Sequence, residues 1–333
     1  MSKIIYLPLE RLDMRYTDAL DEQIMTYAIQ NRILIRRIYP ELLDCGLPTG
    51  AFLNAGQTIN FKAKQLLRLA EMYASDEIDS GDVIFVSDLW FPGIEAVAYL
   101  NHFYKKSVKL KGIVHAGSWT DTDEVRQMER WASHMETAIF DIADEIFVGS
   151  YFSAEELLKK RMVDPSKVTT TPFPLDYKRL NKWAERTEVK NEFKVAKQNI
   201  VVFNGRHHPE KQPWKFDEIK RFFKDKADWE FIDTHSMDLN KDDYYRLLAK
   251  SKIVISFALQ ENFGFGIQEA VYLGCIPVLP NRLVYKEHYD TAYLYDNDLD
   301  MYRILNEAME GYLGIPNTGT NDHQTLSTWL DLD

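Results

Sequence analysis

Short apolar runs, rich in β-branched and aromatic residues, recur along the chain with patterns of helical period between them. These runs predict buried strands at residues 3–9, 82–89, 111–117, 145–150, 199–205, 229–235, 252–259 and 275–280. Helices are predicted at 18–30, 60–75, 93–104, 122–143, 152–161, 214–225, 241–250, 265–273 and 299–312. Near-continuous apolar strands that alternate with helices are typical of parallel sheets covered on both faces. The pattern therefore predicts an α/β protein with Rossmann-like, doubly wound sheets.

The stretch TPFPLDYKRL, residues 171–180, interrupts this pattern with two prolines, and a charged helix predicted at 181–197 precedes the next strand. A chain of 333 residues is longer than a single hydrophobic core usually supports. We therefore expect two Rossmann-like domains, 1–175 and 176–316, that face each other across a cleft. Residues 317–333 begin with loop-forming residues and end in a short predicted helix, which we expect to pack back on the N-terminal domain.

Charge is distributed unevenly along the chain. The net charge is −11, yet residues 178–226 contain fourteen Lys or Arg against seven Asp or Glu, a local balance of +7. A basic segment on an acidic protein can direct a polyanion to one face of the molecule. The alternative is a solvated linker followed by a charged amphipathic helix.

Other features indicate the compartment. No stretch approaches the roughly 20 apolar residues of a membrane span, and the N-terminal MSKIIYLPLERL leads into a predicted strand without a signal-peptide cleavage site. The two cysteines, Cys45 and Cys275, lie far apart in the sequence. We expect a cytoplasmic protein, in the host cytoplasm if it is encoded by a phage, with no structural zinc site.

Polar clusters follow two predicted strands of the C-terminal domain, where ligands bind in open parallel sheets. GRHHPEK, residues 205–211, follows the first of these strands. Its cations Arg206 and Lys211 suit a diphosphate, although a pair of ordinary surface cations is the alternative.

ENFGFGIQEA, residues 261–270, follows the second strand. Gly264 and Gly266 allow a tight turn, and the helix that begins near Phe265 directs its first amides toward an anion. Glu269 suits the paired hydroxyls of a ribose, and Glu261 can accept hydrogen bonds from sugar hydroxyls. The alternative for Glu269 is a first-turn acid that stabilises the helix dipole, and the alternative for Glu261 is a loop acid in water.

Together these elements resemble a known signature. Glu261 and Glu269, with F-G after the first and EA…G-x-P-V after the second, resemble the motif of the α-retaining GT-B glycosyltransferases related to glycogen synthase. GR-x4-K at residues 205–211 matches the same family, and EIFVGSYFSAEEL at 145–157 resembles its last N-terminal strand and following helix. The likeness covers residues 110–295 and implies the GT-B fold and transfer of a sugar from a nucleotide donor.

The resemblance implies a role for each matching residue. Arg206 and Lys211 would bind the donor diphosphate and stabilise the leaving group, Glu269 would hold the donor ribose, and Glu261 would contact the transferred sugar. His115 matches a histidine that lies beside the transferred sugar; its alternative is a hydrogen-bonded histidine at a strand end. The remaining donor-binding positions, which approach through the backbone, are Gly205, Phe263, Gly264 and Phe265. No cofactor or metal is implied, because fixed cations take the place of a metal. We expect a UDP-linked donor.

Two further likenesses concern the acceptor. KDDYYRLLAKSKIVIS (241–256), GCIPVLPNRLVYKEHY (274–289) and TAYLY (291–295) resemble the C-terminal half of the tRNA-queuosine mannosyltransferases. YLPLE (6–10), RYT (15–17) and DVIFVSDLWFPGIEA (82–96) resemble bacteriophage glycosyltransferases that decorate modified bases in DNA. The loop LERLDMRYTDAL after the first strand lacks the glycines that the GT-B family often has there.

We therefore interpret the acceptor as a hydroxyl on a nucleobase, with hydroxymethyl-pyrimidine in phage-type DNA as the lead, queuosine in tRNA second, and a glycan or small molecule third. The acceptor candidates are Arg15, Tyr16 and Thr17 for contacts and Trp90 and Trp119 for stacking, with core packing as the alternative for the tryptophans. Further cations support a polyanion, namely Arg32, Arg36, Arg37, Lys105, Lys106, Lys109 and Lys111.

Three other interpretations compete. A metal-dependent GT-A enzyme would use the Asp-x-Asp at Asp121 and Asp123, but these acids open a predicted helix, where they act as caps. A hydrolase would use Glu261 and Glu269 as its carboxylate pair and would leave the two cations without a role. A non-catalytic module would bind a nucleotide sugar without turnover.

Overall fold

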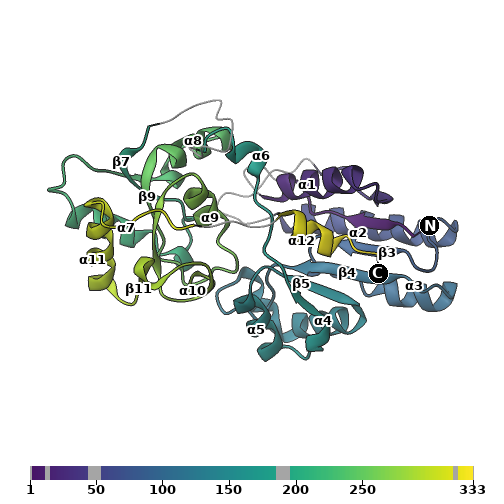
Figure 1. The fold of residues 1–333 in the computed structure, drawn as a ribbon. Coiled ribbons are helices and arrows are strands. Elements are labelled where there is room, and N and C mark those ends of the chain that lie inside the picture. The colour runs from purple at the N-terminus through teal and green to yellow at the C-terminus, as the bar shows by residue number, and fades with distance from the viewer. Residues whose placement is uncertain (1, 12–15, 44–53, 185–195, 318–321, 333) are drawn as a thin grey trace. The chain divides into compact units, whose positions relative to one another are not determined.

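The computed structural model describes residues 2–11, 16–43, 54–184, 196–317 and 322–332 (Figure 1). The chain divides into two compact units: unit 1 is Met1–Pro174 with Asn321–Asp333, and unit 2 is Leu175–Thr320. Each unit has a parallel sheet with helices on both faces. The prediction of two parallel-sheet α/β domains is therefore confirmed.

The sheet of unit 1 has the strand order β2-β1-β3-β4-β5-β6. Its strands are β1 (Ile4–Leu7), β2 (Ile35–Arg37), β3 (Val83–Val86), β4 (Lys109–Val114), β5 (Glu145–Val148) and β6 (Val168–Thr170). Its helices are α1 (Tyr16–Gln30), α2 (Ala55–Ala74), α3 (Ala96–Tyr104), α4 (Glu129–Ile142), α5 (Tyr151–Lys160) and α12 (Asp322–Trp329).

Alternate residues of these strands serve two different faces of the sheet. On one face, Ile84 and Val86 of β3 share a core with apolar residues of α2, α3, α4 and α5. On the other face, the fully buried ring of Trp329 from α12 packs against Phe85 and Phe147, each with ring centroids 6.2 Å away. The end of the chain thus covers a sheet formed by its beginning.

The sheet of unit 2 has the strand order β11-β10-β9-β7-β8. Its strands are β7 (Gln198–Phe203), β8 (Glu230–Asp233), β9 (Ser251–Ile255), β10 (Ile276–Pro280) and β11 (Leu294–Tyr295). Its helices are α6 (Tyr177–Leu180), α7 (Trp214–Phe222), α8 (Lys241–Lys250), α9 (Phe265–Tyr272), α10 (Tyr285–His288) and α11 (Asp298–Met309). One core joins β7, β9 and β10 to α7 and α11, and α8 and α9 contact each other elsewhere in the unit.

The structure differs from the sequence predictions at three strands, at the four-residue helices α6 and α10, and at the helix predicted at 122–143. β2, β6 and β11 have three, three and two residues, which is too short for an apolar run to stand out, and β2 carries two exposed arginines. The helix predicted at 122–143 is a 3₁₀ turn, Glu124–Met128, followed by α4, because the side chain of Asp123 caps the amide of Val125. Most of the helix predicted at 181–197 lies outside the described residues.

The helices that the structure describes include none with both the length and the apolar character needed to cross a membrane.

Candidate active site

In unit 2, the loops that follow two neighbouring strands meet at the carboxyl edge of the sheet. β7 pairs with β9 in parallel, so residues after Phe203 and residues after Ile255 emerge side by side. The loop after β7 carries Gly205, Arg206 and Lys211, and the segment after β9 carries Glu261, Phe263, Gly264, Phe265 and Glu269. The fold therefore brings all the donor-side candidates of unit 2 to one edge.

Two cations of this edge share one buried carboxylate. Nη2 of Arg206 lies 2.8 Å from Oε1 of Glu210, and Nζ of Lys211 lies 3.8 Å from the same oxygen. Glu210 is 6% exposed, whereas the side chain of Arg206 is 43% exposed and reachable from solvent. Glu210 was not predicted from the sequence, and it holds both cations at the same edge of the sheet.

Glu261 links the cations to the turn before α9. One carboxylate oxygen lies 3.2 Å from Nζ of Lys211, and the other accepts a 3.0 Å hydrogen bond from the amide of Gly264. Lys211 also donates to the carbonyl of Gln260. A cation, a carboxylate and the start of a helix thus form one connected group, which suits a ligand with both phosphate and hydroxyl groups.

Two glycines are required by this geometry. Gly264 precedes α9 with φ +80°, a left-handed conformation that side chains disfavour. At Gly205, a Cβ would lie 2.6 Å from Cζ of Phe203, so a larger residue would displace a core ring. The rings of Phe263 and Phe265 pack edge to face, with centroids 4.8 Å apart, and fix the turn between the glycine and the helix.

Glu269 lies on α9 and is 5% exposed. Its Oε1 accepts hydrogen bonds from the hydroxyl of Tyr245 at 2.7 Å and from Nζ of Lys241 at 3.1 Å. Burial, together with the neighbouring Glu269 carboxylate, raises the pKa of Tyr245 far above its ordinary value, so the hydroxyl remains a donor. Lys241 and Tyr245 were not predicted as site residues. The sequence signal that could have indicated them is their spacing of four residues on a predicted helix, within the range 110–295 that resembles the GT-B family.

We expect Glu269→Gln to raise the KM for the nucleotide-sugar donor at least tenfold with little change in kcat. The amide keeps the shape of the side chain but removes the charged acceptor proposed for ribose hydroxyls, an interaction made equally in ground and transition states. Steady-state kinetics with varied donor measure this. The matched control is Glu307→Gln, which loses a pair with exposed Arg303. An unchanged donor KM in Glu269→Gln would remove the residue from the donor site.

In unit 1, His115 follows β4 and has both ring nitrogens engaged. Nε2 lies 2.7 Å from the carbonyl of Ser87, which can only accept, so this nitrogen carries the proton. Nδ1 then accepts from the hydroxyl of Tyr16 at 3.1 Å, and the ring of Phe173 lies 5.0 Å away. Burial lowers the pKa of His115 below its ordinary value, and the charge of Asp88 partly opposes this shift. The imidazole is therefore neutral near pH 7.

This pKa shift predicts a pH dependence of stability. The folded chain binds the His115 proton less readily than the unfolded chain. The contribution of His115 to the free energy of unfolding therefore falls as the pH decreases below about 6.5, and it stops falling below the folded-state pKa. We expect His115→Gln to lose less free energy of unfolding than the wild type between about pH 7.5 and about pH 5.5. Denaturant titrations at each pH measure this, with exposed His134→Gln as the control. Parallel curves for wild type and His115→Gln would contradict the prediction.

The structure places the acceptor candidates in different environments. Tyr16 begins α1 and contacts His115, so two residues predicted separately lie together. Thr17, next to it, is buried. Arg15 lies outside the described residues.

The two candidate tryptophans differ in exposure. Trp90 is half-buried and lies beside Trp131, with ring centroids 6.5 Å apart. Trp119 is 4% exposed within the core of unit 1, where it packs edge to face on Phe140 at 5.7 Å. Core packing, the alternative weighed for these residues, describes Trp119 in this structure.

A buried carboxylate on α4 ties together the loops after β3 and β4. Glu136 is 1% exposed and accepts from Nε1 of Trp90 at 2.9 Å, from the amide of Ser118 at 2.7 Å and from its hydroxyl at 2.8 Å. Nε of Arg161 adds a charged bond at 2.8 Å. No local pattern in the sequence indicates this network, because its members come from four separate segments.

The Asp-x-Asp pair serves local structure. Asp121 is exposed and lies 3.2 Å from Nζ of Lys160, while Asp123 caps the 3₁₀ turn that precedes α4. Across the described parts of the chain, no group of three or more His, Cys, Asp or Glu side chains is placed to hold a metal ion.

Comparison with solved structures identifies the architecture. The catalytic domain of starch synthase IV from Arabidopsis thaliana, bound to ADP and acarbose, matches with a TM-score of 0.63 over 100% of this chain and 96% of that chain, at 11% identity. The chain has the GT-B fold. HepE from Anabaena, solved with UDP, matches with a TM-score of 0.58 over 99% of this chain and 96% of its own, at 12% identity.

Comparison with curated sequences gives a shorter match. A tRNA-queuosine α-mannosyltransferase from Drosophila melanogaster is 43% identical over 58 residues, which are 17% of this chain and 15% of the mannosyltransferase. The chain matches no protein-family model.

Proposed function

We propose that this GT-B chain is a glycosyltransferase that moves a sugar from a nucleotide-sugar donor, UDP-linked in our proposal, to a hydroxyl with retention of anomeric configuration. The observation that carries the proposal is the connected group in unit 2, where Lys211 contacts Glu261 at 3.2 Å and Glu261 accepts from the amide that precedes α9. A diphosphate is bound by fixed positive groups and by the N-terminus of a helix, and a sugar is bound by carboxylates that accept from its hydroxyls.

In the proposed reaction, the acceptor oxygen bonds to the anomeric carbon while the bond from that carbon to the diphosphate oxygen breaks. The departing phosphate takes the proton of the acceptor hydroxyl on the same face of the sugar. Negative charge grows on the diphosphate in the transition state, and Arg206, Lys211 and the N-terminus of α9 stabilise it. Glu261 is engaged by Lys211 and Gly264, a placement that suits a hydrogen-bond acceptor for the sugar. The fixed cations make a metal cofactor unnecessary in this scheme.

For the acceptor, we propose a hydroxyl on a modified nucleobase, with hydroxymethyl-pyrimidine in phage-type DNA as the lead. Its support is the likeness of residues 6–10 and 82–96 to phage enzymes and the local +7 of residues 178–226. A base inside a duplex would have to be flipped out of the stack to reach the site. Tyr16 and Trp90, which lie at the carboxyl edge of the sheet of unit 1, are the proposed contacts.

A second acceptor, queuosine in tRNA, is favoured by one observation. The 43% identity over 58 residues links this chain to a tRNA-queuosine mannosyltransferase. The match covers too little of either chain to transfer the activity of that enzyme, so the tRNA remains an alternative to be tested beside DNA.

Radiolabelled nucleotide sugars, both UDP- and ADP-linked, test the function directly. The protein is incubated with hydroxymethylated DNA, unmodified DNA, tRNA and an oligosaccharide, and label is counted on each polymer. We expect label on hydroxymethylated DNA alone; label on tRNA supports the second candidate. Label confined to the oligosaccharide would overturn the nucleobase acceptor. Donor binding with neither transfer nor donor hydrolysis would overturn the enzyme in favour of a binding protein.

A further inference from the structure

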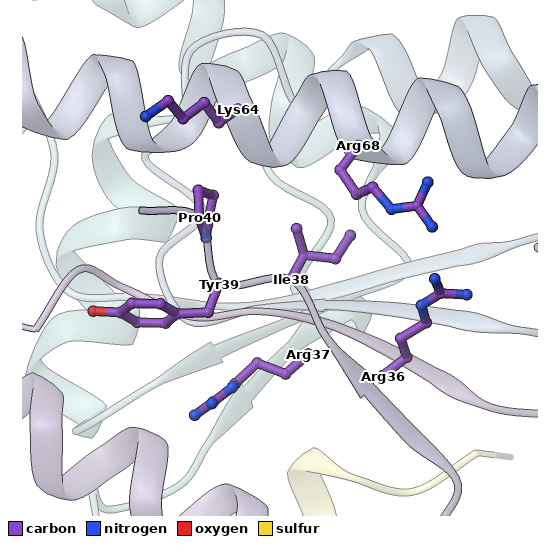
Figure 2. Close-up of a pocket in the computed structure, with 7 residues that line it drawn as sticks. All are labelled: Arg36, Arg37, Ile38, Tyr39, Pro40, Lys64 and Arg68. Atoms are coloured by element: carbon purple, nitrogen blue, oxygen red, sulfur yellow. The ribbon is translucent and has the colours of Figure 1, made fainter. Parts of the chain in front are cut away.

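A basic pocket of about 350 Å³ opens at the carboxyl end of β2, the edge strand of unit 1 (Figure 2). Its lining residues come from β2, the segment after it and α2: Arg36, Arg37, Ile38, Tyr39, Pro40, Lys64 and Arg68. Four of these seven side chains are cationic and none is acidic, in a chain whose net charge is −11. Such a local excess of positive charge attracts an anion.

The counter-charges of these cations do not line the pocket. Glu77 pairs with both Arg36 and Arg68, and Asp21 lies 2.8 Å from Nη1 of Arg37. Among the described residues, Arg36 and Arg37 each donate through Nη1 alone, so each guanidinium keeps further N–H groups for a ligand. The carboxylates thus position the arginines without using all of their N–H donors.

The shape and chemistry of the pocket fit a phosphate with an organic group attached. Figure 2 shows Arg36 and Arg68 on the same side of Ile38, with Lys64 near Pro40 and Tyr39. Arginine forks bind phosphate oxygens in pairs, and the volume lies in the range of small-ligand sites. The side chains of Arg36 and Arg37 are 44% and 35% exposed, so a ligand can reach them from solvent.

The position of the pocket relates it to the proposed acceptor site of the same unit. Three strand spacings separate β2 from β4 in the order β2-β1-β3-β4, which is roughly 14 Å along the edge that also carries His115. One strand of a B-form duplex places a phosphate about every 3.4 Å of helix axis, so this span corresponds to about four nucleotides. A polynucleotide with its target base beside Tyr16 and His115 would reach the pocket with a nearby backbone phosphate.

We propose that this pocket binds a backbone phosphate of the nucleic-acid acceptor and sets the position of the polymer relative to the reacting base. The inference rests on the proposed nucleobase acceptor, and its ligand class is a phosphodiester. The pocket contributes to acceptor binding and takes no part in the chemical step, so it affects the acceptor KM rather than kcat.

The double variant Arg36→Gln/Lys64→Gln tests the proposal. We expect it to weaken binding of a hydroxymethylated DNA oligonucleotide at least fivefold, measured by fluorescence anisotropy. The slope of log affinity against log salt should become shallower by about 1, since each phosphate contact that is lost reduces the slope by about one. The matched control is Arg130→Gln/Lys159→Gln, which removes one exposed arginine from α4 and one exposed lysine from α5 of the same unit. An equal loss of affinity in the control would show a general charge effect and overturn the pocket.

A second comparison separates a backbone phosphate from other ligands. Transfer to a hydroxymethyl-pyrimidine nucleoside, which has no phosphate, should be equal in wild type and double variant, whereas transfer to the oligonucleotide should show a raised acceptor KM. If a nucleoside monophosphate binds in the micromolar range and loses affinity in the variant while DNA affinity stays unchanged, the polymer proposal is overturned.

The phosphate pocket and the nucleobase acceptor are two hypotheses that can be disproved independently of each other. Unchanged DNA affinity in the double variant overturns the pocket even where wild-type transfer to DNA is established. Weakened DNA binding in the variant, with no transfer to any nucleic acid by the wild type, supports the pocket as a phosphate site and overturns the proposed acceptor.

Discussion

Lys211→Ala should lower kcat for sugar transfer about a hundredfold, which corresponds to about 2.7 kcal/mol of lost transition-state stabilisation. The ammonium lies in a largely water-excluded position, 12% exposed, and contacts Glu261 at 3.2 Å. A fixed charge in such a position acts on the growing charge of the diphosphate without the reorganisation that water requires. Single-turnover kinetics at saturating donor measure the chemical step apart from binding.

The control for this prediction is Lys226→Ala, which removes a half-buried cation paired with Glu310 in the same unit. Lys211→Arg separates charge from structure, because it keeps the cation and should retain more activity than alanine. Tryptophan fluorescence and thermal melting establish that each variant is folded. A folded Lys211→Ala protein with kcat within about threefold of the wild type would exclude Lys211 from leaving-group stabilisation.

Glu136→Leu should destabilise unit 1 by about 3–5 kcal/mol, the typical effect of removing one partner from a buried ion pair. Arg161, whose side chain is 7% exposed, would lose the carboxylate at 2.8 Å. The amide and hydroxyl of Ser118 and the indole of Trp90 would lose their acceptor as well. Each stranded donor adds its own desolvation penalty.

Urea unfolding followed by fluorescence measures this loss, and hydrogen exchange assigns it to unit 1, because a chain of two units need not unfold in one step. The control is Glu155→Gln, which breaks an exposed pair with Lys159 and should change stability by less than about 0.5 kcal/mol. A loss below about 1 kcal/mol in Glu136→Leu would show that water or neighbouring groups replace the carboxylate. We expect the stability loss of Glu136→Gln to lie between those of Glu155→Gln and Glu136→Leu, because the amide oxygen can still accept from Trp90.

Much of the donor side of this protein follows from local sequence. A run such as VIFV or IVVF indicates a buried parallel strand, and the residues after such strands must share one edge of the sheet. That rule groups Arg206, Lys211 and Glu261 from the sequence alone, and the structure joins Arg206 to Lys211 through Glu210 and pairs Lys211 directly with Glu261. The roles of these residues in catalysis stay predictions.

The sequence by itself determined two α/β domains, because hydrophobic period and strand-end chemistry are local properties that the chain carries along its length. Only the tertiary structure decided which distant groups meet. Strands of two or three residues, such as β2, form because neighbouring strands pair with them, and no local pattern reports that pairing. The bond from Tyr16 to His115, the Glu136 network and the basic pocket join residues tens of positions apart, and such contacts are fixed by packing and burial of the whole unit rather than by any segment alone.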